Sequence, residues 1–220
     1  MSSAARKAGD TYVSGYDRLK DLPPVFSLNT LVRATGMNRA SAKVALTRWA
    51  AKKMIEGAGP RAGIYFNRVV DRNGDSAHSV KALLMKYPSA TLCGASILHS
   101  AGWTTQIPST LHVAVEARSS YVQIDGATLF PRPVSWFQFM QAQVAWVGTA
   151  DTHAPGNIST YGLRALAPAW ALADLYADKS GHAWYPDEDD LDVPRAAMAA
   201  LRRACKAMQG APAWLLTPRQ

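Results

Sequence analysis

Cysteine is scarce in this chain, which has two, Cys93 and Cys205, among its 220 residues. Two distant cysteines supply neither the disulfide framework of a small secreted domain nor a Cys-x-x-Cys metal site. Each lies among apolar residues, so we interpret both as buried free thiols. The first residues, 1–7, also lack the apolar stretch of a secretory signal. These absences favour a protein of the reducing cytoplasm.

Long hydrophobic runs are absent as well. No apolar stretch approaches the roughly 18 to 20 residues that a bilayer-spanning helix needs, so we expect no membrane segment. Hydrophobic residues make up 48% of the chain and charged residues 18%, proportions typical of a folded globular protein rather than a disordered one. A chain of this length can form one large domain or two modest ones, each with its own core.

Acidic residues are few in the first third of the chain. Residues 1–73 contain 13 Lys and Arg against 5 Asp and Glu, whereas residues 74–220 contain 11 of each sign. The whole net charge of +8 therefore belongs to the N-terminal part. Such a distribution is typical of a polyanion-binding module joined to a neutral domain. An ordinary solvated basic surface would give the same count, so charge alone leaves both interpretations open.

A polar stretch at residues 71–76, with an Asn-Gly pair that favours a turn, marks the predicted boundary between two domains. We place the domains at 1–73 and 77–220. In the second domain the patterns predict both element types. The predicted helices are 79–86, 89–100, 164–178 and 194–208, and the predicted strands are 110–116, 120–124 and 127–130.

The first domain reads as three helices. The first covers 10–22 and ends before two prolines. Ser27 is a suitable N-cap for the second helix, which Gly36 ends. Asn38 caps the third, which continues to about Lys53. Its apolar residues recur at i, i+3, i+4 and i+7 and form one stripe: Ala42, Ala45, Leu46 and Trp49.

A hairpin follows the third helix, with strands at 54–56 and 64–67 around the glycine-rich loop 57–63. Helix, glycine-containing turn, helix and hairpin is the element order of a winged helix-turn-helix. The predicted fold class is therefore α+β, with an N-terminal winged helix-turn-helix followed by a mixed α/β C-terminal domain.

With the apolar stripe turned inward, the opposite face of the third helix is free to enter the major groove of DNA. The basic residues of this helix could contact guanine or phosphate, and its small residues allow a close approach to the bases. The arginine at the wing tip could contact the minor groove or the DNA backbone. The candidate DNA-binding residues are Asn38, Arg39, Ser41, Lys43, Thr47, Arg48, Lys52 and Arg61. Winged helices also serve as protein-interaction modules, which is the alternative here.

An enzyme is the rival class for the second domain. The sequence shows no phosphate-binding glycine loop, nucleophile elbow or metal-ligand spacing of histidines. Glu116, Asp125 and the acidic run at 187–192 are the residues that a metal-dependent nucleic-acid-processing enzyme with a winged-helix targeting domain would use. An acidic run more often precedes a helix start as a solvated loop. We expect no catalytic residue, metal or cofactor.

Several segments of the second domain resemble the AbiEi antitoxin family in their order. They are residues 87–99, with a Pro-x-Ala start and a small-residue helix; Gly102-Trp103-Thr104-Thr105-Gln106-Ile107-Pro108, followed by the strand at 111–115; Leu166–Leu175; and Pro186–Asp192. With the winged helix before them, the resemblance extends over most of the chain from about residue 26 to 208.

The resemblance implies an antitoxin of a bacterial type IV toxin-antitoxin or abortive-infection system. Such a protein represses its own promoter through the winged helix, and its C-terminal domain counters a nucleotidyltransferase toxin. DNA reading would fall to the helix of residues 39–53 and the wing at Arg61. Since operators of this kind are commonly inverted repeats, we expect two copies on the DNA. The neutral charge of residues 74–220 does not favour direct contact between that domain and nucleic acid.

Overall fold

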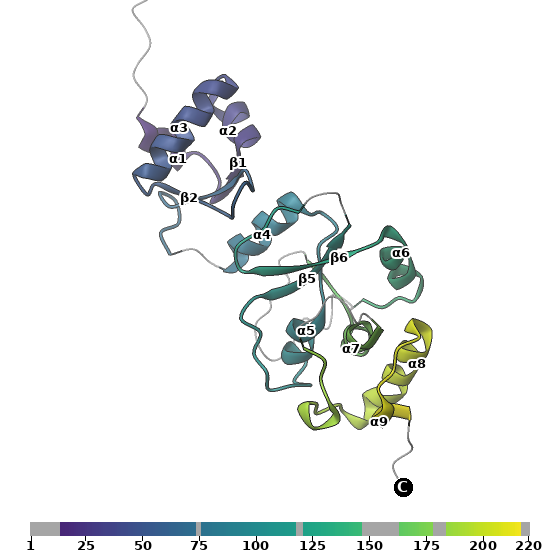
Figure 1. Ribbon diagram of the computed structural model, residues 1–220. Coiled ribbons are helices and arrows are strands. Elements are labelled where there is room, and N and C mark those ends of the chain that lie inside the picture. Colours follow the sequence, from purple (N-terminus) through teal and green to yellow (C-terminus); the bar gives the residue numbers. More distant parts are fainter. Residues whose placement is uncertain (1–13, 74–75, 118–120, 147–162, 178–183, 217–220) are drawn as a thin grey trace, which may run out of the picture. The chain divides into compact units, whose positions relative to one another are not determined.

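The computed structural model describes residues 14–73, 76–117, 121–146, 163–177 and 184–216. The chain forms two compact units: unit 1 comprises Met1–Ala58 and Ala62–His78, and unit 2 comprises Gly59–Arg61 and Ser79–Gln220. Both contain helices and a sheet of their own, which confirms the α+β class (Figure 1). Within the described ranges, no helix is long and apolar enough to cross a bilayer.

Unit 1 combines three helices with a small antiparallel sheet. Its elements in order are α1 (Gly15–Lys20), β1 (Val25–Ser27), α2 (Leu28–Thr35), α3 (Arg39–Ala51), β2 (Ile55–Gly57) and β3 (Ile64–Asn67). The strand order is β1-β3-β2. Phe26 of β1 pairs with Tyr65 of β3, and β3 pairs on its other side with β2. The predicted hairpin is thus present, and β1, too short to show a period in the sequence, adds a third strand.

The predicted helix ends are largely confirmed. The Ser27 hydroxyl accepts from the Thr30 backbone N–H, which caps α2, and Gly36 ends that helix in the left-handed conformation at φ 67°. The Asn38 side chain accepts from the Ser41 backbone N–H and caps α3. The first helix is shorter than predicted because Ser14 caps it at Gly15; residues 10–13 of that prediction lie outside the described residues.

The inward stripe of α3 is confirmed. Ala42, Leu46 and Trp49 are buried and Ala45 is half-buried. They form one core with α2 and β1, in which Leu31 and Phe26 are fully enclosed. Burying one face of α3 in this way leaves its other side exposed along the whole helix.

Gly15 of α1 lies against the indole of Trp49. A Cβ at Gly15 would overlap Trp49 Nε1 and approach Trp49 Cδ1 to 3.1 Å. Because the ring is buried, we expect Gly15→Ala to lower the free energy of unfolding by about 1–3 kcal/mol, although helix propensity alone would raise it by up to about 1 kcal/mol. Urea denaturation of the full chain measures the sign. In a Trp49→Phe background, Gly15→Ala should lower the free energy of unfolding by less. An equal decrease in both backgrounds would contradict the overlap with Trp49 as the cause.

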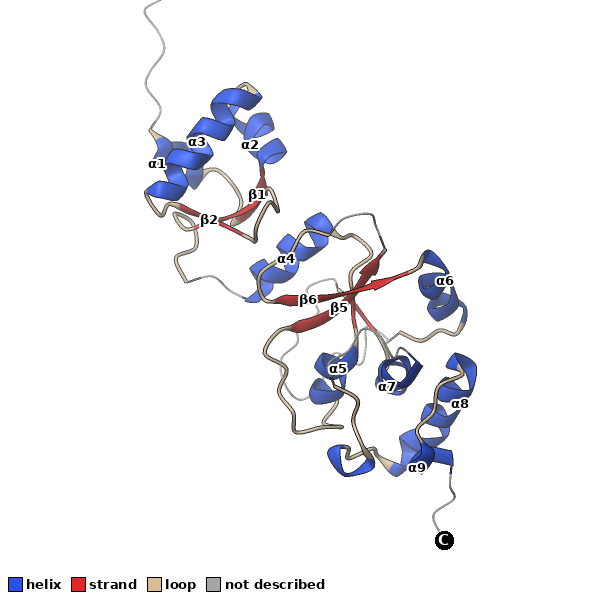
Figure 2. Cartoon of the chain, in the orientation of Figure 1, coloured by secondary structure: helices blue, strands red, loops and turns tan. Residues whose placement is uncertain are grey.

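Unit 2 is built on a mixed four-stranded sheet. Its helices are α4 (Ser76–Lys86), α5 (Gly94–Ser100), α6 (Val134–Ala142), α7 (Pro168–Ala177), α8 (Met198–Met208) and α9 (Ala213–Leu216), and its strands are β4 (Thr91–Leu92), β5 (Leu111–Glu116), β6 (Ala127–Arg132) and β7 (Arg164–Ala165). The strand order is β6-β5-β4-β7, with β5 and β6 parallel and β4 and β5 antiparallel. Figure 2 shows α7 between α5 and α8, which it contacts.

Three predictions for unit 2 are wrong in detail. The helix predicted over 89–100 is a strand, β4, followed by the shorter α5. The helix predicted over 164–178 likewise begins with β7, and its last residue lies outside the described range. The helix predicted over 194–208 begins with a 3₁₀ turn at Arg195–Ala197. In the first two cases a two-residue strand in the sheet precedes the helix, and so short a segment shows no alternation.

The strand predicted at 120–124 is absent from its described part, residues 121–124. The Tyr87 hydroxyl donates to the carbonyl of Val122 at 2.9 Å and accepts from its N–H at 2.8 Å. Both backbone groups of Val122 are therefore satisfied by a side chain rather than by a neighbouring strand. β6 forms no hairpin with residues 121–124 and pairs in parallel with β5.

Candidate nucleic-acid interface

Positive charge in unit 1 gathers around α3. The sequence from residue 22 to residue 55 contains no Asp or Glu. It contains six cations, all exposed: Arg33, Arg39, Lys43, Arg48, Lys52 and Lys53. Elsewhere in the unit, two nearby acids are bonded to other cations, Glu56 to Arg68 at 2.6 Å and Asp17 to Lys20 at 3.2 Å. The surface of α3 is therefore the most basic part of the unit.

The exposed side of α3 has two flanks, because successive residues turn by about 100° around a helix. Arg39, Lys43 and Thr47 follow one flank at four-residue spacing, as predicted. The other predicted residues of α3, Ser41 and Arg48 with Lys52 after its end, follow the opposite flank. Between them lie small or aliphatic residues, Ala40 and Val44, the latter 50% exposed. A basic edge on each side of a slim apolar strip suits a helix entering a major groove.

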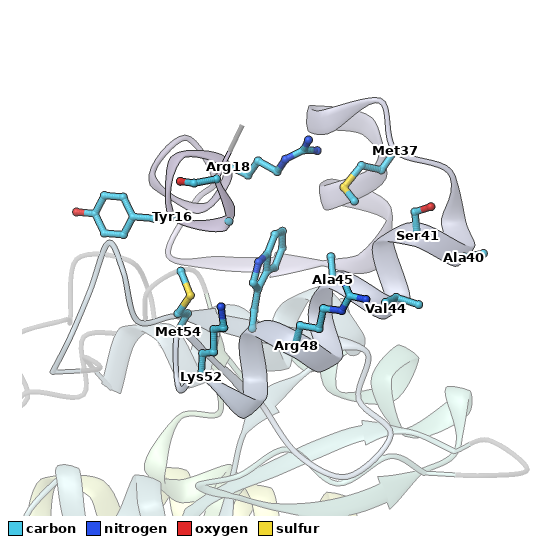
Figure 3. Close-up of a pocket in the computed structure, with 13 residues that line it drawn as sticks. Tyr16, Arg18, Met37, Ala40, Ser41, Val44, Ala45, Arg48, Lys52 and Met54 are labelled. Carbon is cyan, nitrogen blue, oxygen red and sulfur yellow. The ribbon is translucent and has the colours of Figure 1, made fainter. Parts of the chain in front are cut away.

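The second flank borders a hollow between α1 and α3, which we call the α1–α3 groove (Figure 3). Its volume is about 790 Å³. Trp49 and the half-buried Met37 and Met54 give it an apolar interior. The residues that line it are Ser14, Gly15, Tyr16, Arg18, Met37, Ala40, Ser41, Val44, Ala45, Arg48, Trp49, Lys52 and Met54.

Hydrogen bonds orient the start of α3. The Arg39 guanidinium donates to the side-chain carbonyl of Asn29, on α2, at 3.0 Å. The Asn38 carbonyl is engaged as the helix cap, at 2.8 Å from the Ser41 backbone nitrogen. The Thr47 hydroxyl donates to the Lys43 carbonyl at 3.2 Å, within the helix. Arg39 is thus held by a neighbouring helix, which fixes its position relative to the exposed strip.

Arg61 stands apart from the other candidate residues. It lies in the β2–β3 loop and is exposed, and residues 59–61 belong to unit 2. Its φ of 58° is left-handed, a conformation that a residue with a side chain seldom adopts. Its contact with DNA stays a prediction.

Two residues of this surface were missed in the sequence. Asn29 sits inside a helix, where nothing in the pattern shows that it reaches Arg39, ten positions later. Arg18 was counted among the basic residues but assigned no role, because only the packing of α1 against α3 brings it to the groove. The one signal in the sequence was that Arg18 lies about one turn into α1 and outside its buried stripe.

The acids of the enzyme alternative do not meet. Glu116 is at the end of β5, whereas Asp125 precedes β6, whose first residue pairs with the first residue of β5. These two residues are therefore at opposite ends of a parallel strand pair, which is about 16 Å long at 3.3 Å per residue. Within the run 187–192, Glu188–Asp190 form a 3₁₀ turn in which Asp187 and Asp190 cap each other. Among the described residues, no group of three His, Cys, Asp or Glu could hold a metal ion.

The neutral charge of unit 2 conceals a segregation along its chain. Five acids fall within 187–192, while residues 193–220 contain no acid at all. Arg202, Arg203 and Lys206 are exposed on one face of α8. A zero sum over residues 74–220 therefore does not describe the local surface, and unit 2 has a basic helix face of its own.

Comparison with known proteins identifies a fold but no family. No family model and no curated protein matches the chain. The crystal structure of the RV2827C protein from Mycobacterium tuberculosis is similar, with a TM-score of 0.56 and 13% sequence identity. The match covers 90% of this chain and 70% of that protein. At this identity the likeness shows the shared fold alone.

Proposed function

We propose that unit 1 is a winged helix-turn-helix that binds duplex DNA through α3, and that the protein is a transcriptional repressor. The observation that carries the proposal is the exposed side of α3, with basic residues on both flanks and no acid from residue 22 to residue 55. Phosphate neutralisation by such residues supplies most of the affinity of a DNA-binding module. In this proposal Arg39 and Lys43 read bases, and Arg48 and Lys52 bind phosphates.

Binding to DNA from upstream of the gene, compared with random duplex of equal length, tests the proposal. Arg39→Ala and Lys43→Ala should each lower the preference for the operator by about 1–3 kcal/mol, because each would lose a bidentate base contact. Fluorescence anisotropy at fixed salt measures both affinities. Arg33→Ala, a matched exposed cation on α2, should leave the ratio unchanged. Equal losses on operator and random DNA for Arg39→Ala would show that this flank does not read bases.

We further propose that the repressor is an antitoxin, with unit 2 countering a nucleotidyltransferase-like toxin. Support for this step comes from the ordered resemblance of residues 87–115, 166–175 and 186–192 to the AbiEi antitoxins. Neutralisation during co-expression with such a toxin encoded by a neighbouring gene tests it. Neutralisation that depends on Glu116 or Asp125 would instead favour the enzyme alternative. On an inverted repeat, we expect two copies of the chain, which the stoichiometry of the DNA complex measures.

A further inference from the structure

Positive charge lines both walls of the α1–α3 groove. Arg18 comes from α1, and Arg48 and Lys52 come from α3 and its C-cap. Figure 3 shows Arg18 extending from α1 toward Met37. Among the described residues, the thirteen that line the groove include no acid. A hollow with three cations and no acid attracts anions and raises their local concentration.

The one acid of α1 is Asp17, and it lies outside the groove lining. Its carboxylate accepts from the Ser14 hydroxyl at 2.7 Å and from the Lys20 ammonium at 3.2 Å. These bonds, that of Ser14 first, hold the pKa of Asp17 below its usual value. Asp17 therefore stays ionised and paired with Lys20. Because Lys20 does not line the groove, it is a suitable control residue.

The α3 wall of the groove is a long row of residues that winds slowly around the helix. Ala40, Val44, Arg48 and Lys52 succeed one another at four-residue spacing, which places them in one strip along the helix. The strip is about 18 Å long at 1.5 Å per residue. One DNA strand carries a phosphate about every 3.4 Å along the axis. The groove wall therefore matches a linear anion with several charges better than a compact one.

We propose that a phosphate strand of duplex DNA runs along the α1–α3 groove while α3 occupies the major groove. Arg18 contacts that strand from α1, opposite Arg48 and Lys52. The inference rests on the proposed function and adds a second helix to the interface. It also explains why the basic residues of α3 fall on two flanks, since the two flanks of a helix in the major groove face different strands.

The test is a salt titration of DNA binding by the full chain. Arg18→Ala should weaken binding to operator and random duplex alike, by about five- to tenfold at 0.1 M salt, and lower the log–log salt slope by about 0.9. Arg18→Lys keeps the charge and should restore most of the slope. Lys20→Ala, two residues away and on the opposite side of the same helix, should leave both quantities unchanged. In ethylation-interference experiments, Arg18→Ala should lose the interference signal at one or two adjacent phosphates, whereas Lys20→Ala should lose it at none.

The possible results separate the two proposals. If the unaltered chain binds no DNA, the proposed function and the groove assignment fail together. If it binds DNA and Arg18→Ala behaves as Lys20→Ala does, the groove assignment alone fails. If Arg18→Ala loses binding to poly-glutamate but keeps its binding to DNA, the groove accepts an acidic protein segment instead, and the groove assignment is overturned. Thermal unfolding of each variant establishes that it is folded, and Arg18→Gln repeats the test should alanine unfold the chain.

Discussion

Asp174→Ala is expected to lower the free energy of unfolding by about 3–5 kcal/mol, the usual cost of breaking a buried ion pair from one side. Asp174 of α7 is 1% exposed, and its carboxylate accepts from the Arg132 guanidinium at 2.9 Å and from Trp136 Nε1 at 2.8 Å. Arg132 belongs to β6 and Trp136 to α6, so one carboxylate joins three elements of unit 2. Its removal leaves the 7% exposed Arg132 without that counter-charge in the core.

Urea denaturation of the full chain, followed by tryptophan fluorescence, measures this cost. Asp189→Ala, an exposed acid of the 187–192 run, should change the free energy of unfolding by no more than about 0.5 kcal/mol. The double substitution Arg132→Met with Asp174→Leu should cost less than Asp174→Ala alone, because it removes both charges. If the double variant is less stable than Asp174→Ala, the ion pair stabilises unit 2 by more than the neutralisation of two buried charges.

This buried pair also shows what sequence patterns cannot predict. Arg132 and Asp174 are 42 residues apart. Arg132 lies just beyond the strand predicted at 127–130, and Asp174 lies within the helix predicted at 164–178, where a polar residue is expected to face solvent. Only the fold places them together, since α7 must cover β6 before the two side chains can meet. The parallel pairing of β5 and β6 was likewise hidden, because it depends on the course of the chain between the two strands rather than on a local pattern.

Unit 1 was far more predictable, because its signals are local. A cap, a left-handed glycine and an apolar stripe each lie within a few residues of what they control, as Ser27, Gly36 and the stripe of Ala42, Leu46 and Trp49 show. The basic residues of the candidate site were visible for the same reason. The position of Arg18 beside the second flank required the packing of α1 on α3.

The affinity for DNA is expected to fall about 500-fold between 50 and 200 mM salt if five cations each neutralise one phosphate, since each contributes about −0.9 to the log–log slope. The five are Arg18, Arg39, Lys43, Arg48 and Lys52. On the operator, where Arg39 and Lys43 are proposed to read bases, three phosphate contacts remain, so the slope becomes about −2.7 and the fall about 40-fold. Fluorescence anisotropy on random duplex isolates this electrostatic part, because it contains no base-specific contact.

The control is the free energy of unfolding over the same salt range, which should change little because few described ion pairs of unit 1 bridge its elements. A slope near zero would contradict DNA binding by unit 1. A slope clearly steeper than about −4.5 would mean that more than five phosphates are neutralised. The exposed Arg202, Arg203 and Lys206 of α8 would then be the residues to replace, because residues 193–220 contain no acid to offset them. Whether the slope returns to about −4.5 when these three are replaced decides whether the basic face of unit 2 takes part in DNA binding.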